Sequence, residues 1–162
     1  MSKTFAIAFA VGIACIAIAV ACIFYMQRGA HIDLSGKTLK VRTTPLDENS
    51  SLVVVDFRLN NPADYPFMVR SVTVVMEDAA GAQTEGQTVS EPDAKRVFAG
   101  IPMLGQKYND TLIMRDKLPP HTTWDRMVAA RFEAPESKLQ ARKRFLVRIE
   151  EVDGKIVEIP EK

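Results

Sequence analysis

The chain has 162 residues, of which 47% are apolar and 25% are charged, and its 21 basic and 20 acidic residues leave a net charge of +1. An apolar fraction this large excludes an intrinsically disordered chain, and a charge this small excludes a strongly basic nucleic-acid-binding protein. The only cysteines, Cys15 and Cys22, lie near the amino terminus, which excludes a disulfide scaffold for the rest of the chain.

The run from Phe5 to Met26 carries no charged residue and predicts one transmembrane helix after a short tail over residues 1–4. Such a helix is about 33 Å long, against about 30 Å for the hydrocarbon core of a bilayer. A cleavable signal peptide is the alternative, but its apolar core has only about 7–15 residues. The residues at the end of the run, 24–27, offer no small-residue cleavage site. We therefore expect a retained signal-anchor, followed by a linker over residues 27–36.

The position of the anchor suggests a location for the remaining chain. A tail this short before an apolar run is typical of a signal-anchor, which places the larger domain outside the cytoplasm, in the periplasm if the protein is bacterial. Basic residues counted on both sides of the helix favour the opposite orientation. The expected partners are the lipid bilayer and a membrane protein of unknown identity, and no nucleic acid is expected.

Small residues recur on two opposite faces of the predicted helix. In lipid, such stripes allow helix backbones to approach closely, so they predict packing against a partner helix. The alternative is that alanine simply fills an anchor. The predicted helix-packing residues are Ala6, Ala10, Gly12, Ala14, Ala17 and Ala21.

Residues 37–162 show the two-residue alternation typical of strands with one buried face. In Ser51–Asn60, apolar residues alternate with positions that include Asp56 and Arg58. Short strands at such intervals predict one all-β domain, an antiparallel β-sandwich of the immunoglobulin or fibronectin type. The expected strands are 37–43, 51–60, 67–77, 87–89, 111–115, 126–132, 145–151 and 155–159, and the expected short helices are 93–99 and 135–142.

A corner rich in asparagine and proline separates the strands 51–60 and 67–77. Its residues are Asn61, Pro62, Tyr65, Pro66 and Phe67. Together with the strand before it, this corner resembles the late-embryogenesis-abundant type 2 domain, also called the LEA14-like or water-stress and hypersensitive-response domain. The resemblance covers residues 37–132 and implies a β-sandwich without enzymatic activity, loosely associated with desiccation stress. The segments 91–110 and 135–162 depart from the family pattern.

Residues 97–104 form the most apolar run outside the expected strands. They either close the open end of the sandwich or form an exposed patch for a partner or a lipid. The residues of this predicted interface are Phe98, Ile101, Met103 and Leu104.

No catalytic or metal-binding motif is present in the sequence. His31 and His121 are the only histidines, and no Cys/His spacing typical of a metal site occurs. The basic residues of 138–148 are interleaved with glutamates and predict a mixed-charge surface. We therefore expect no enzyme and no cofactor, but a membrane-anchored interaction module, for example an accessory subunit of a membrane complex. The alternatives are a lipid-binding or apolar-ligand-binding domain and a stress-protective protein.

Overall fold

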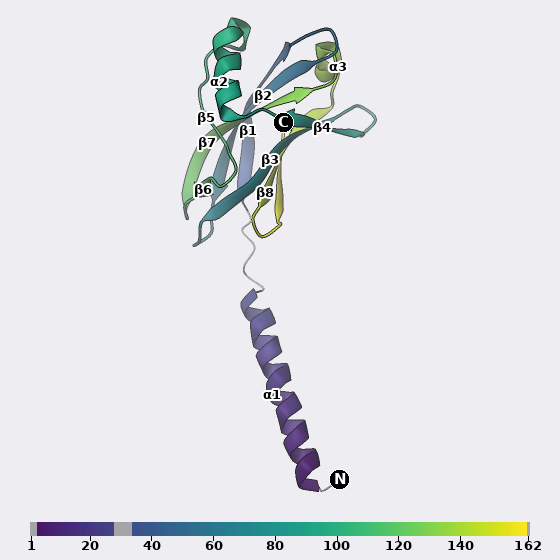
Figure 1. Cartoon of the computed structure of the whole chain (residues 1–162), viewed down its shortest axis with the longest axis vertical. Helices are drawn as coiled ribbons and strands as arrows, with labels where there is room; N and C mark the ends of the chain where they lie inside the picture. The colour runs from purple at the N-terminus through teal and green to yellow at the C-terminus, as the bar shows by residue number, and fades with distance from the viewer. Residues whose placement is uncertain (1–2, 28–33, 162) are drawn as a thin grey trace. The chain divides into compact units, whose positions relative to one another are not determined.

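The computed structural model describes residues 3–27 and 34–161 of the chain (Figure 1). Two compact units are present, Met1–His31 and Ile32–Lys162. The first contains the helix α1, Lys3–Gln27, and the second contains all the strands.

The helical conformation of α1 covers the predicted run, but its predicted role needs correction. Among the residues that the structure describes, no helix is long and apolar enough to cross a membrane. The single-pass anchor, and the membrane localisation that depends on it, are therefore not supported.

The second unit is mostly antiparallel β-structure. Its hydrogen-bonded strands follow the order β1-β2-β7-β4-β3-β8-β9, with β5 beside β7 and β6 beside β3. The strands are β1 Ser35–Pro45, β2 Ser51–Asn61, β3 Phe67–Glu77, β4 Gln83–Thr88, β5 Asp110–Thr111, β6 Lys117–Leu118, β7 Thr122–Phe132, β8 Arg144–Glu151 and β9 Ile156–Pro160. The helices are α2 Glu91–Gly100, the short 3-10 helix η1 Pro102–Leu104, and α3 Glu136–Gln140.

The prediction of two separate sheets is wrong, because β4 joins them. The first residues of β4 pair with β3, from Glu77↔Gln83 to Val74↔Gly86, and its last two pair with β7. The outer strands of this path also meet, since the Thr38 hydroxyl donates to the Pro160 carbonyl over 3.0 Å. The result is one nearly closed, barrel-like sheet rather than a sandwich (Figure 1).

Alternating apolar side chains of the long strands fill the inside of this sheet. The largest fully buried ones include Phe57, Phe67, Phe132 and Phe145. Burying a side chain of this size stabilises the fold by roughly 1.5–3 kcal/mol relative to leaving it exposed. The coarse prediction of a β-rich domain with one main core is confirmed.

Strand β2 is buried on both faces, whereas the alternation predicted one solvated face. Leu52 and Val54 point away from the main core and form a second cluster with Ala94 of α2 and Leu104 of η1. The segment from α2 to η1 therefore covers the outer face of β2 and β7 (Figure 1).

Candidate functional site

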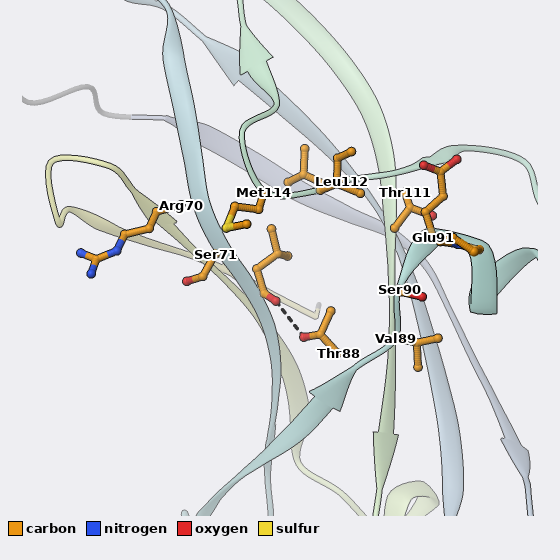
Figure 2. Close-up of a pocket in the computed structure, with 12 residues that line it drawn as sticks. Arg70, Ser71, Thr88, Val89, Ser90, Glu91, Thr111, Leu112 and Met114 are labelled. Carbon is orange, nitrogen blue, oxygen red and sulfur yellow. Dashed lines mark hydrogen bonds between the residues drawn. The ribbon is translucent and has the colours of Figure 1, made fainter.

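One cavity of the β domain is an open groove of about 500 Å³ beside β3. Its walls are residues 70–72 of β3, residues 88–92 at the end of β4 and start of α2, and residues 111–114 after β5 (Figure 2). We call this cavity the β3 groove. Its lining is mostly apolar, with Val72, Val89 and Leu112 among the residues that form it.

The groove exists because β3 loses a neighbouring strand along part of its length. On one side β3 pairs with β8 over most of its length. On the other side, the described pairings with β4 begin at Val74 and those with β6 end at Met68. Val69 is bonded to the turn that precedes β6, through Arg115 and Asp116. Among the described residues, no strand therefore pairs with residues 70–73 of β3 on the groove side.

Thr88 shows which backbone groups face the groove. Its hydroxyl donates to the Val72 carbonyl over 2.8 Å, the contact marked by the dashed line in Figure 2. In a strand, the N–H and C=O of one residue point to the same side of the chain. The Val72 N–H therefore points to the groove as well.

The opposite wall is a tight turn rather than the predicted strand 111–115. Asp110 and Thr111 pair with β7, and the Leu112 N–H donates to the Met127 carbonyl over 2.8 Å. The chain then turns, because the Ile113 N–H donates to the Asp116 carboxylate over 3.0 Å and Arg115 adopts a positive φ of 71°. This turn leaves Ile113 and Met114 exposed at the mouth of the groove.

Thr111 contributes an unusual polar group to the groove lining. The residue is only 5% exposed. Its hydroxyl has no hydrogen-bond partner among the described residues. Because a buried hydroxyl without a partner costs about 1–3 kcal/mol, this group is an unsatisfied polar atom in the groove wall, with almost no accessible surface.

A buried ion pair holds the α2 wall on the sheet. One guanidinium nitrogen of Arg42 contacts the Asp56 carboxylate at 2.7 Å, and the other donates to the Leu104 and Gln106 carbonyls at 2.7 and 2.9 Å. Asn109 donates to the second carboxylate oxygen of Asp56 at 2.8 Å. The Arg42 guanidinium also lies 5.0 Å from the ring centroid of Phe98.

The segment 97–104, predicted as either a cap or an interface, serves mainly to cover the sheet. Leu104 is buried, and Phe98 and Ile101 are partly buried against the second cluster. Met103 differs from them, since it is 91% exposed. Its predicted role in an interface stays a prediction.

The predicted helix-packing residues all lie in α1. Gly12, Ala14, Ala17 and Ala21 are exposed, whereas the side chains of Ala6 and Ala10 lie outside the described part of the structure. A Cβ added at Gly12 would meet no atom within 4 Å. Their packing against a partner helix stays a prediction.

The predicted family motif forms a corner that is built around Asn61. The buried Asn61 amide donates to the carbonyls of Tyr65, Leu118 and Pro119 at 2.9, 3.2 and 3.1 Å, and its oxygen accepts from the Ala63 N–H. Phe67 then begins β3 and is fully buried, while Pro62 is exposed and Tyr65 and Pro66 are more accessible than Phe67. The motif therefore fixes the path between β2 and β3.

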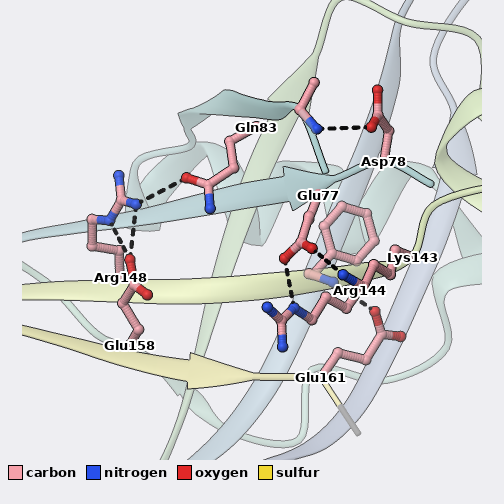
Figure 3. Close-up of polar contacts among 10 residues, drawn as sticks. Glu77, Asp78, Gln83, Lys143, Arg144, Arg148, Glu158 and Glu161 are labelled. Atoms are coloured by element: carbon pink, nitrogen blue, oxygen red, sulfur yellow. Dashed lines mark hydrogen bonds and ion pairs between the residues drawn. The ribbon is translucent and has the colours of Figure 1, made fainter. Parts of the chain in front are cut away.

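Glutamates neutralise the basic residues near α3 and β8, in agreement with the predicted mixed-charge surface. Glu77 accepts from Lys143 at 2.6 Å and from Arg144 at 2.7 Å (Figure 3). The pKa of Glu77 lies below its ordinary value of 4.5 because Lys143, and then Arg144, hydrogen-bond its carboxylate. Arg148 pairs with Glu158, and Arg142 with Glu161.

The histidines lie apart from the β3 groove. His121 is exposed and contacts Asp64 at 2.9 Å, and His31 lies outside the described residues. Within residues 3–27 and 34–161, no group of three or more His, Cys, Asp or Glu side chains could hold a metal ion.

Comparisons with known proteins identify no family. No family model matches the chain, and no curated protein matches it. Among solved structures, a candidate ApaA protein from Bordetella pertussis has a TM-score of 0.37 and 16% identity, over 81% of this chain and 89% of that one. The structural genomics target SoR45 has a TM-score of 0.32 and 13% identity, over 82% of this chain and 81% of that one. At these TM-scores neither structure carries an inference for this chain.

Proposed function

We propose that the β domain is an interaction module that binds an apolar segment of a partner protein in the β3 groove. The observation that carries this proposal is the coincidence of an apolar groove with an interrupted strand edge at residues 70–73. Contiguous apolar surface marks binding sites, and open strand edges pair readily with extended chains. The exposed Ile113 and Met114 extend the apolar surface to the mouth of the groove.

A peptide selection on the full-length chain tests this proposal. Peptides of 12 residues would be enriched from a random library on the immobilised protein, and their affinities measured by fluorescence anisotropy. Met114→Lys places a charge at the groove, whereas the control Met103→Lys changes a methionine that does not line it. We expect Met114→Lys to weaken the best peptide by about tenfold or more, and Met103→Lys by less than about twofold. Equal affinities of the two variants would contradict the proposal.

A small apolar molecule is a second candidate for the same groove. Its volume of about 500 Å³ lies within the range of about 300–1,000 Å³ that is typical of small-molecule pockets. Dodecanoate distinguishes the two functions. Saturable dodecanoate binding that is sensitive to Met114→Lys, without any groove-dependent peptide, favours the small molecule over the peptide.

A further inference from the structure

We infer that a second cavity of the β domain binds a small zwitterion, of the chemical class of a free α-amino acid. The cavity has a volume of about 330 Å³ and lies between the ends of β4 and β7 and the helix α3. We call it the β4–β7 cleft. It shares no lining residue with the β3 groove, so this inference goes beyond the proposed function and does not depend on it.

The β4–β7 cleft exists because β4 and β7 part after a short ladder. Their described pairs end at Gln87↔Arg131. Beyond this pair, β4 stays beside β3 as far as Gln83, whereas β7 stays beside β2 as far as Phe132. The gap between the two strands is the cleft, and Met76 and Phe132 of the main core line it from the inside.

Main-chain groups of β4 face this gap. The Val89 N–H, just after β4, donates to the Ala129 carbonyl of β7 over 2.8 Å. Because alternate residues of a strand turn their main-chain groups to the same side, Gln87 and then Glu85 face β7 as well. Gln87 has its partner in the ladder, but no described residue pairs with the main chain of Glu85 on that side. Glu85 therefore offers an N–H and a C=O to a molecule in the cleft.

Unpaired charges of both signs line the β4–β7 cleft. The cations are Arg131 and Lys138, and the carboxylates are Glu85 and Glu133. None of the four forms an ion pair with another described residue, although the four basic residues that lie just beyond them in the chain, within 142–148, are all paired with glutamates. The cleft is thus a place where charge is available to a ligand.

The balance of these charges indicates the chemistry of the ligand. Two cations and two carboxylates give the lining a net charge of zero. A ligand with charge of only one sign meets as much repulsion as attraction there. A zwitterion instead presents each of its charges to side chains of the opposite sign, and complementarity of this kind determines specificity.

The volume of the cleft sets the size of the ligand. At about 30 Å³ for each water-sized group, the cleft holds roughly eleven non-hydrogen atoms, which is the size of an α-amino acid of medium length. In this arrangement the ligand carboxylate pairs with Arg131 and Lys138, and its ammonium group pairs with Glu85 and Glu133. The ligand side chain lies along the aliphatic stems of the two cations.

An NMR titration of the full-length chain with L-leucine tests the site. We expect saturable shifts of the Gly86 and Glu133 amide resonances, with a Kd of about 1 mM. Two analogues separate the charges: 4-methylpentanoate lacks the ammonium group, and 3-methylbutylamine lacks the carboxylate. Each should bind about fivefold more weakly or less well still. If either analogue binds as tightly as leucine, the assignment of a zwitterion is overturned, and if no saturation is seen with leucine at about tenfold that Kd, the site is overturned.

Variants of the lining charges locate the binding. Arg131→Gln and Glu85→Gln should each weaken leucine by about fivefold. Arg115→Gln and Glu48→Gln are the matched controls, because these two exposed residues also form no ion pair with a described residue but do not line the cleft. The controls should leave the Kd unchanged. Equal affinities of the cleft variants and the controls would overturn the site, whereas peptide binding in the β3 groove should be the same in all four variants.

Discussion

Removal of the Arg42 guanidinium should detach the segment from α2 to η1 from the outer face of the sheet. In Arg42→Met, the Asp56 carboxylate keeps Asn109 as a partner but loses its buried cation. The side chains of Arg42 and Asp56 are only 9% and 3% exposed. Breaking a pair this buried costs about 3–5 kcal/mol, because an uncompensated charge remains inside.

Urea unfolding followed by the fluorescence of Trp124, the single tryptophan, measures this cost. With a urea dependence of about 2 kcal/mol per molar, the midpoint should fall by about 2 M. Arg58→Met is the matched control, since Arg58 pairs with Asp125 at 2.6 Å but the two side chains are 43% and 35% exposed. That pair should contribute only about 0–1 kcal/mol.

Hydrogen exchange locates the effect within the chain. The amides of residues 97–104 should exchange faster in Arg42→Met than in Arg58→Met, because the carbonyls of Leu104 and Gln106 lose their donor. If Arg42→Met costs no more stability than Arg58→Met, the ion pair does not hold this segment, and the reasoning about the α2 wall is refuted.

Three further changes test the fold around the groove. Glu77→Gln should lower the stability of the domain at pH 7 and reduce the amount of stability that is lost in acid. The folded pKa of Glu77 lies below 4.5, so the stability that its carboxylate contributes is present above pH 4.5 and is lost as the pH falls through the folded pKa. Thermal melts at pH 7 and pH 3 measure this difference. Gly86→Ala should lower the free energy of unfolding by about 1–3 kcal/mol, because a Cβ at this position would lie 2.6 Å from the ring of the buried Phe132. Gly100→Ala is the control and should be neutral in the same melts, since a Cβ there would meet no atom within 4 Å. Asn61→Ala should cost about 3 kcal/mol in urea unfolding, because the two N–H groups that three buried carbonyls share are lost. The partly buried Asn60→Ala should cost under about 1 kcal/mol, and similar values for the two would contradict the role of the corner.

Local patterns predict most of the strands correctly. The alternation in Ser51–Asn61 and Phe67–Glu77 defines β2 and β3, and the Asp153-Gly154 turn predicts the hairpin of β8 and β9, in which Gly154 has a φ of 85°. These elements depend on residues close in sequence. Their side chains have a fixed period of two, so the pattern survives whatever surrounds the strand.

Features that depend on distant residues were not predicted. The second buried face of β2 requires α2, which is held through a contact between Arg42 and Leu104. Similarly, the expectation of two sheets was wrong because β4 pairs with β3 up to Gly86 and with β7 after it. The residues around Gly86 do not indicate this change of neighbouring strand.

The candidate site was missed for the same reason. Val72 and Thr111 look like ordinary strand residues in the sequence, and they become a site only because the ladder beside β3 ends and a turn follows β5. The apolar run 97–104 packs partly against β2 and β7, and its predicted role in an interface stays a prediction.

The affinity of one library-selected peptide for three forms of the full-length chain tests the central claim most directly. Fluorescence anisotropy titrations would compare the unchanged chain with Met114→Lys at the groove mouth and Met103→Lys on η1, both exposed methionines at 64% and 91%. A groove that binds a partner segment predicts a loss of about tenfold or more for Met114→Lys alone. Equal binding by all three chains would contradict it.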